Sequence, residues 1–415
     1  MDHFRYRRGI LHAEEVPLER IAARVGTPTY VYSEATLRRH WEVVTRAFAG
    51  HPTLVCYSVK ASSNLALLAR FAAWGSGFDV VSGGELARVR RAGGDPRRAV
   101  FAGVGKRREE LVQALRARVL LINVESAEEL ELLDQVAREL GVRAPFAVRV
   151  NPAVDPRTHR AISTGMETSK FGVPLREAYA LYRRSRRMRG LVARGVDCHI
   201  GSQLTDTRPL GRAVAQVARL YQELVGQGYP LSLLDVGGGL GIPYRDERPP
   251  HPQAWAGVLL RAVRGLPATL LVEPGRLLVG NAGVLVTRVL FRKRSPRRQF
   301  VIVDAGMNDL LRPALYGAEH EVVPVRRRRG PTVRAEVVGP VCESTDTLAS
   351  ARRLVLPEQG DLFCVRTAGA YGMSMASNYN GRPRPAEVLV HGRRFQVVRA
   401  RDAVRDLWRG ESTGR

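Results

Sequence analysis

Eight short apolar runs alternate with amphipathic segments in the first two thirds of the chain. They lie at residues 53–59, 77–81, 99–102, 119–124, 146–150, 195–200, 231–236 and 269–272, and a helical segment follows each of them except the last. Such runs predict buried strands, and their alternation with helices is typical of a parallel sheet. An open doubly wound sheet would seldom reach eight strands, so the pattern favours a closed α/β barrel, a (β/α)8 TIM barrel.

The pattern changes after about residue 280. Apolar runs at 300–303, 333–338, 362–365, 388–390 and 395–398 are separated by turn residues with little helix between them. This spacing predicts an antiparallel β domain, and we expect the early strand at 28–32 to join it. The predicted domains are therefore a barrel over residues 33–280 and a β-rich domain made from residues 1–32 and 281–415.

Unusual polar residues stand at the ends of several barrel strands. Lys60 ends the first strand, and Asp79, His199 and Glu273 lie at the ends of others. Each alone could be structural, and a lysine there can simply extend its amine to the rim. Active sites of such barrels lie, however, at the carboxyl ends of the strands, so four such residues together favour an active site.

The composition of the chain supports a chemical role for Lys60. The chain has 65 Lys+Arg, but only four of them are lysines. Arginine therefore serves for nearly every positive charge, and a retained lysine is a candidate for chemistry that needs a titratable amine, such as a Schiff base.

A glycine-rich loop, Gly237-Gly238-Gly239, follows another strand. Backbone N–H groups in such a loop can approach a phosphate, although a tight turn is the alternative. The dinucleotide fingerprint G-x-G-x-x-G fails because Ile242 replaces its last glycine. An imine-forming lysine, a compact phosphate site, a histidine and a carboxylate together describe a pyridoxal phosphate site.

The charge, the cysteine content and the lack of long apolar runs bear on three other possibilities: nucleic-acid binding, a metal site and a membrane segment. The net charge is +25, but the arginine clusters at 183–187, 292–294 and 326–329 lack interleaved aromatic residues, so we expect a solvated surface and no specific nucleic acid partner. Four scattered cysteines have no metal-ligand spacing, and no metal site is expected. No apolar run approaches the ~18 residues of a membrane span, and the N-terminus lacks a signal-peptide core. We therefore expect a cytoplasmic protein.

The motifs carry a family resemblance. Segments 57–61, 77–86, 199–203, 237–239, 273–276, 342–344 and 368–371 resemble, in order, the signatures of the diaminopimelate decarboxylases, which share the fold of alanine racemase and eukaryotic ornithine decarboxylase. The similarity runs from about residue 28 to 400 and includes 158–165, 304–310 and 378–385. One departure is Ser62, where the family usually has asparagine, and we expect a small local effect.

The resemblance implies a role for each matching residue. It implies that Lys60 holds pyridoxal phosphate covalently, that His199 stacks on its ring, that Glu273 pairs with the pyridine nitrogen, and that Cys342 protonates Cα after CO2 leaves. These four are the expected catalytic residues. Cofactor contacts are expected from Lys60, Asp79, His199, Ser202, Gly237, Gly238, Gly239, Glu273, Gly275, Arg276 and Tyr371. Substrate contacts are expected from Arg276 and Tyr371, from Arg312 and Tyr316 with the distal carboxylate, and from Glu343 with the distal ammonium.

The implied activity is that of a carboxy-lyase that converts meso-2,6-diaminopimelate to L-lysine and CO2, the last step of lysine biosynthesis. The resemblance also implies a homodimer in which Cys342 and Glu343 reach the partner's cofactor. One alternative is a related decarboxylase of ornithine, arginine or a carboxylated polyamine, but these substrates offer no distal carboxylate to Arg312 and Tyr316. A non-catalytic homologue is the other alternative, and the presence of both Lys60 and Cys342 argues against it.

Overall fold

The computed structural model describes residues 2–155 and 169–414, and these form two compact units. One unit consists of residues 41–242 and 248–277, and the other of residues 1–40, 243–247 and 278–415. The chain passes from one unit to the other within α2 (Glu34–Ala47), whose first turn is capped by Ser33 through its Oγ and the Thr36 N–H.

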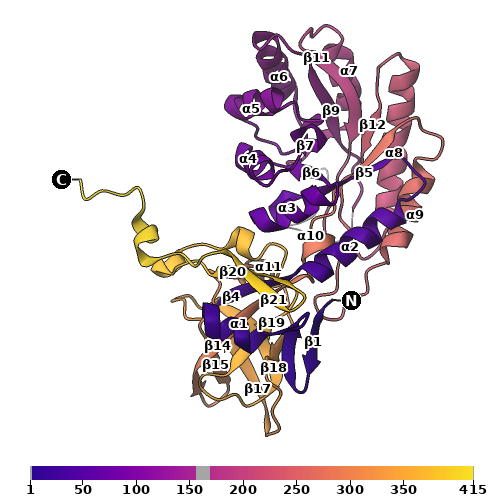
Figure 1. Cartoon of the computed structure of the whole chain (residues 1–415). Helices are drawn as coiled ribbons and strands as arrows, with labels where there is room; N and C mark the ends of the chain where they lie inside the picture. The colour runs from indigo at the N-terminus through magenta and orange to yellow at the C-terminus, as the bar shows by residue number, and fades with distance from the viewer. Residues whose placement is uncertain (1, 156–168, 415) are drawn as a thin grey trace. The chain divides into compact units, whose positions relative to one another are not determined.

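The first unit is a closed parallel barrel, as predicted (Figure 1). Its strands are β5 (Thr53–Ser58), β6 (Gly77–Val80), β7 (Ala99–Phe101), β8 (Leu121–Val124), β9 (Ala144–Asn151), β11 (Leu191–Asp197), β12 (Leu233–Asp235) and β13 (Thr269–Val272). Each pairs in parallel with the next, and β13 pairs back to β5 with Leu270 opposite Thr53. A two-residue strand, β10 (Val173–Pro174), adds to β9. All eight strands overlap the predicted apolar runs, although β11 begins and ends earlier than the run at 195–200.

Helices follow the strands and bury one face each. They are α3 (Leu65–Ala73), α4 (Gly83–Arg91), α5 (Arg108–Ala117), α6 (Ala127–Glu139), α7 (Leu175–Ser185), α8 (Arg208–Gly226) and α9 (Pro252–Ala262). Asn64 caps α3 by accepting from the Ala66 N–H, and Ser126 caps α6 in the same manner. A side-chain oxygen at this position satisfies one of the helix's unbonded donors, so these residues fix where each helix begins.

The second unit is built on a β sheet whose strand order is β18-β17-β15-β14-β4-β20-β21, with β16 and β19 attached beside β14. The bounds are β4 (Thr29–Ser33), β14 (Gly283–Arg294), β15 (Gln299–Val303), β16 (Val322–Pro324), β17 (Thr332–Val338), β18 (Thr347–Val355), β19 (Leu362–Val365), β20 (Ala386–His391) and β21 (Arg394–Arg399). As predicted, the early strand β4 joins this sheet. The sheet is mixed, because β4–β20 and β15–β17 pair in parallel while its other pairs are antiparallel.

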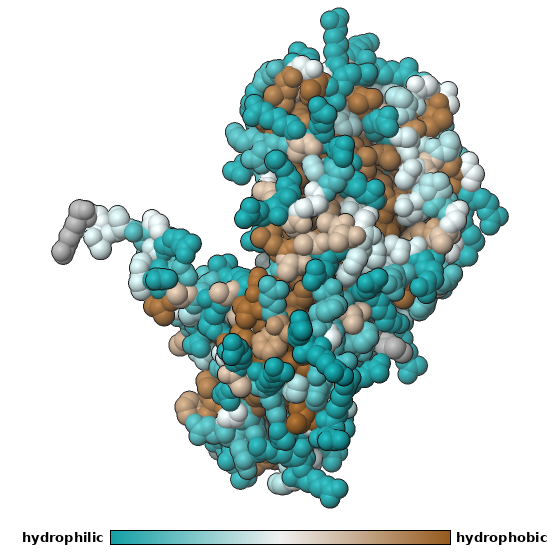
Figure 2. Space-filling model, in the orientation of Figure 1, coloured by the Kyte–Doolittle hydropathy of each residue, from teal (hydrophilic) through white to brown (hydrophobic). Residues whose placement is uncertain are grey.

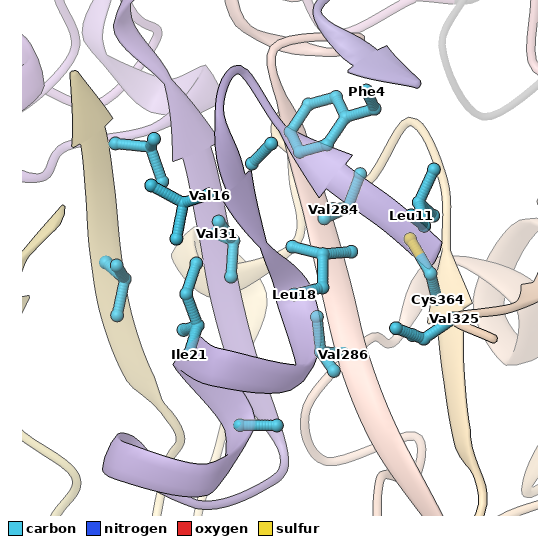
Figure 3. Packing of buried hydrophobic residues seen from close by; sticks show 14 residues of the cluster. Phe4, Leu11, Val16, Leu18, Ile21, Val31, Val284, Val286, Val325 and Cys364 are labelled. Atoms are coloured by element: carbon cyan, nitrogen blue, oxygen red, sulfur yellow. The ribbon is translucent and has the colours of Figure 1, made fainter. Parts of the chain in front are cut away.

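The N-terminus contributes more to this unit than the single predicted strand. β1 (Phe4–Arg7), β2 (Ile10–Ala13) and β3 (Val16–Pro17) form a small antiparallel sheet, and α1 (Leu18–Val25) follows. Phe4, Leu11 and Leu18 pack against Val284 and other residues of the main sheet (Figure 3). These contacts bury the side chains of Phe4, Leu11, Ala13, Val16, Leu18, Ile21 and Ala22, which stabilises this part of the chain.

Hydrophilic residues cover much of the face shown in Figure 2. The arginine clusters are exposed, and some members pair with acids: Arg326 contacts Glu19, and Arg328 contacts Glu358 and Asp361. Among the described residues, no helix is both long and apolar enough to pass through a bilayer.

Candidate active site

Lys60 lies at the carboxyl end of β5, in a single 3-10 turn formed by Val59–Ala61. Its Nζ lies 2.6 Å from Oδ2 of Asp79, which β6 places in register with Ser58. The Ser58 hydroxyl donates to the same Oδ2 at 2.6 Å. Burial opposes ionisation of Asp79, but the charge of Lys60 and these hydrogen bonds outweigh burial and lower its pKa. The lysine is therefore held by a buried counter-ion rather than extended freely to solvent.

His199 follows β11 and contacts the glycine loop. The Gly238 N–H donates to Nδ1 of His199 over 3.2 Å, so Nδ1 is the unprotonated nitrogen. Burial and the positive charges of Arg149 and Lys60 lower the pKa of His199 to about 3. The imidazole is therefore neutral at physiological pH and carries its proton on Nε2.

The three loop glycines are required by packing. A Cβ at Gly237 would lie 2.2 Å from Nδ1 of His199, and one at Gly238 would lie 2.2 Å from the carbonyl oxygen of Glu273. Gly239 has φ +101°, and a Cβ there would meet Gly201 at 2.5 Å. A side chain at any of these positions would separate the loop from β11 and β13, so the loop keeps His199 and Glu273 close together. Their predicted contact with phosphate stays a prediction.

Glu273 follows β13 and is buried among other carboxyl groups. Burial, followed by the charges of Asp235 and Asp79, raises its pKa well above the ordinary value. Its Oε1 has no hydrogen-bond partner among the described residues. An unsatisfied buried oxygen is costly, so this atom is suited to a donor that arrives with a bound group.

Three buried residues at this end of the barrel were missed by the sequence analysis. Asp235 accepts from the Gly237 N–H at 3.0 Å and from Asn123 at 3.1 Å, and burial together with Asp197 raises its pKa to about 8. Arg149 donates to Glu125 at 2.9 Å, and its Nε lies 4.0 Å from Asp197. Asp197 and Asp235 are the last residues of β11 and β12, and an acid ending an apolar run was the signal that could have found them.

The remaining barrel candidates lie close to this group. Nη2 of Arg276 donates to the Ser202 hydroxyl at 3.3 Å. Gly275 is packed so tightly that a Cβ would lie 2.9 Å from that of Ser58. Lys106, another of the four lysines, donates to two backbone carbonyls and to Glu129, and this satisfies its ammonium.

Five predicted residues lie in the second unit. Arg312 begins α11 (Arg312–Tyr316), is buried, stacks 4.2 Å from the centre of the Tyr244 ring and donates to Nε2 of His320 at 2.8 Å. The His320 Nδ1–H then donates to the Arg366 carbonyl, which fixes a neutral tautomer. Tyr244 and His320 were not predicted. The other candidates are Tyr316 at the end of α11, Tyr371 with a positive φ of 56°, and Cys342 and Glu343 on an exposed loop.

A separate cavity of about 410 Å³ lies at the amino end of the barrel strands. Its lining includes Trp41, Phe48, Thr53, Trp74 and Arg98. Thr53 begins the strand that Lys60 follows, so the cavity is at the opposite end of β5 from Lys60. Within residues 2–155 and 169–414, no cluster of three or more histidine, cysteine or acidic side chains could hold a metal.

The residues present fit pyridoxal phosphate. Lys60 offers the amine for an imine, and Arg276 with Ser202 offers donors for a phosphate. Glu273 offers a buried carboxyl oxygen that has no hydrogen-bond partner in the described part of the chain. A barrel with these groups at the carboxyl ends of its strands defines a pyridoxal-phosphate enzyme.

Comparison with known proteins identifies the family. Residues 34–280 match the family model described as the pyridoxal-dependent decarboxylase, pyridoxal binding domain. The chain is 50% identical over 414 residues to the diaminopimelate decarboxylase of Vibrio cholerae and 52% identical over 416 residues to that of Pseudomonas aeruginosa, with 99% of each chain covered. The crystal structure of the Helicobacter pylori enzyme complexed with L-lysine is 41% identical, with a TM-score of 0.92 over 94% of this chain and 98% of the other.

The chain belongs to the diaminopimelate decarboxylase family. This confirms the resemblance drawn from the motifs and, through the matched domain, the pyridoxal cofactor. The motif at 158–165 lies outside the described residues. The individual roles expected of the site residues stay predictions, which the geometry above now makes specific.

Proposed function

We propose that the chain decarboxylates meso-2,6-diaminopimelate to L-lysine and CO2 with pyridoxal phosphate, at a site formed by the residues named above. The observation that carries the proposal is the match to diaminopimelate decarboxylases over 99% of the chain at about 50% identity. The paired Lys60 and Asp79 and the buried Glu273 supply the side chains that such a reaction needs.

The bound cofactor supplies an electron sink for the electron pair that remains on Cα when the carboxylate leaves as CO2. Lys60 would hold the cofactor through its amine and be released when the substrate amine takes its place. Asp79 would keep the displaced Lys60 amine close to the strand end. Glu273 would share a proton with the pyridine nitrogen through Oε1, and neutral His199 would lie against the ring without adding charge to it.

Cys342 would complete the reaction by donating its thiol proton to the Cα from which CO2 has left, and this carbon becomes Cε of L-lysine, which bears the side-chain amine. Cys342 to Thr345 are exposed in the chain. We propose that this exposed loop reaches the cofactor of a second copy, so that a homodimer contains two composite sites. The barrel boundaries at 33–280 and a cytoplasmic location are also proposed here.

Substrate choice would depend on Arg312. Its guanidinium is buried and oriented by Tyr244 and His320, and a planar guanidinium binds a carboxylate with two parallel hydrogen bonds. Together with Tyr316 it suits the distal carboxylate of diaminopimelate, while Glu343 suits the distal ammonium. Ornithine and arginine have no second carboxylate, so they would not form these two hydrogen bonds with Arg312.

Product analysis tests this proposal. The purified chain, loaded with pyridoxal phosphate, should release CO2 and L-lysine in equal amounts from meso-diaminopimelate. Lys60→Ala serves as the control for non-enzymatic release and should give neither product. Release of CO2 without L-lysine, or no release at all from the wild-type chain, would contradict the proposed reaction.

A further inference from the structure

The loop that carries Cys342 and Glu343 is anchored on its inner side by one buried acid. Asp346 accepts from the Val341 N–H at 2.7 Å through Oδ2 and from the Met307 N–H at 2.6 Å through Oδ1. Its own backbone N–H donates to the Glu343 carbonyl. These bonds set the base of the loop, but they do not contact the Glu343 side chain or the Cys342 N–H.

Both of those groups are instead contacted by one short turn, Tyr379–Gly381. The Tyr379 hydroxyl donates to Oε2 of Glu343 at 2.8 Å, and Oδ1 of Asn380 accepts from the Cys342 N–H at 2.7 Å. Consecutive residues of the turn therefore bind consecutive residues of the loop. The turn belongs to the 378–385 motif of the sequence, to which no function has been assigned above.

Fold stability alone does not account for these contacts. Tyr379 is 45% exposed, and an exposed hydrogen bond contributes little to the free energy of folding. Asn380 adopts the left-handed region with φ 55°, where glycine is favoured on conformational grounds. Asparagine tolerates that conformation and adds the acceptor that glycine lacks, so the side-chain oxygen has a use of its own.

The chemistry of the pair suits a carboxylate that must bind a cation. The hydrogen bond to Glu343, reinforced by the charge of that carboxylate, raises the pKa of Tyr379, so the phenol keeps the proton that it donates. With Oε2 bonded to Tyr379, Oε1 of Glu343 is left to face an ammonium. The bond to Oε2 also restricts rotation of the Glu343 side chain before the substrate binds, so binding loses less conformational entropy.

We propose that Tyr379 and Asn380 are positioning residues: Tyr379 orients Glu343 toward the distal ammonium of the substrate, and Asn380 fixes the backbone of Cys342. The inference rests on the proposed function, because it takes the roles of Glu343 and Cys342 from there. It adds a specificity determinant that does not itself touch the substrate.

Tyr379→Phe tests the first half, since it removes only the hydroxyl. We expect the KM for meso-diaminopimelate to rise about tenfold with a small change in kcat, because the lost bond is a charge-assisted one. The kinetics of 2-aminopimelate, which has both carboxylates but no distal ammonium, should not change. The matched control is Tyr179→Phe, which removes another exposed tyrosine–glutamate bond, to Glu223 on the barrel, and should leave both substrates unaffected.

An equal loss with both substrates, or no loss with either, would overturn the assignment of Tyr379. Combining Tyr379→Phe with Glu343→Gln gives a further check. If the hydroxyl acts through the carboxylate, the double variant should have the KM of Glu343→Gln alone.

Asn380→Gly tests the second half, because glycine keeps the backbone conformation and removes the acceptor. We expect kcat to fall about tenfold with little change in KM, and Asn380→Asp, which retains the acceptor, to restore it. A thiol-alkylating reagent gives a readout that is independent of turnover, because Cys56, Cys198 and Cys364 are buried and Cys342 is exposed.

The rate of Cys342 labelling should change severalfold in Asn380→Gly and return in Asn380→Asp. Unchanged labelling and turnover in Asn380→Gly would overturn the inference. Failure of the wild-type chain to release CO2 would instead overturn the proposed function, and the labelling assay distinguishes the two failures because it needs no substrate.

Discussion

Replacing Glu273 by glutamine is the most informative single change in the barrel. The amide keeps the shape of the side chain but cannot hold the negative charge that stabilises a proton on the pyridine nitrogen. A hydrogen bond to a charged group contributes about 1.5–3 kcal/mol, and each 1.36 kcal/mol of barrier changes a rate about tenfold. Glu273 is buried, so solvent does not screen this interaction. We therefore expect kcat to fall about 10- to 150-fold.

The assay is the initial rate of CO2 release from meso-diaminopimelate at saturating cofactor, with cofactor content measured by absorbance. Cofactor binding should persist, because Lys60, Arg276 and Ser202 are unchanged. Glu387→Gln is a suitable control, since Glu387 is also buried and accepts from the Tyr32 hydroxyl in the other unit. This control should lose stability while its kcat stays close to that of the wild type.

Thermal unfolding of the cofactor-free protein separates lost chemistry from a damaged fold. Because burial raises the pKa of Glu273, its contribution to stability is complete below pH ~4, the value of an unfolded carboxyl, and declines as pH rises through the higher folded pKa. Glutamine has no such decline. The variant should therefore gain stability relative to the wild type as pH rises. Unchanged turnover, or a variant that cannot bind cofactor, would refute the role given to Glu273.

Three further predictions follow from the same site and from one buried acid elsewhere. Lys60→Ala should lose the visible absorption of the lysine-bound cofactor and nearly all turnover, and Lys60→Arg should fail as well; near-normal turnover in either would remove Lys60 from the mechanism. Lys60→Ala and Cys342→Ala chains, unfolded and refolded together in equal amounts, should recover roughly a quarter of wild-type activity, because random pairing makes about half of the dimers mixed with one intact site each; no recovery beyond the average of the two variants would place both groups in the site of one chain. Burial raises the pKa of Asp309 to about 7. The difference in unfolding free energy between the wild type and Asp309→Asn, measured by urea titration, should therefore become less favourable to the wild type as pH rises from about 4 to 8. A constant difference would contradict the raised pKa.

The barrel could be predicted because its strands are buried on both faces and therefore appear as continuous apolar runs. The N-terminal strands could not be predicted in this way. They are two to four residues long, and only some of their residues, such as Phe4, Leu11 and Ala13, are buried. The parallel pairing of β4 with β20 joins segments more than 350 residues apart, and no local pattern records it.

The same distinction applies to the site. Four site residues could be found because each stands at a strand end, where the active sites of this fold class lie: Lys60, Asp79, His199 and Glu273. The contact of Arg312 with Tyr244 could not be found, since the two residues are far apart in sequence. His320 is only 8 residues from Arg312, but no local pattern shows that the chain brings these two side chains together. The low pKa of His199 likewise requires knowing that Arg149 and Lys60 approach it.

The proposed substrate has a second carboxylate beside its distal ammonium. Measuring kcat/KM for CO2 release from meso-diaminopimelate, ornithine and arginine with one enzyme preparation shows whether the site selects for that carboxylate. A site built to bind a polar group strongly rejects an analogue that lacks it, so we expect meso-diaminopimelate to exceed the others by about a hundredfold or more. Faster release from ornithine or arginine would contradict the account.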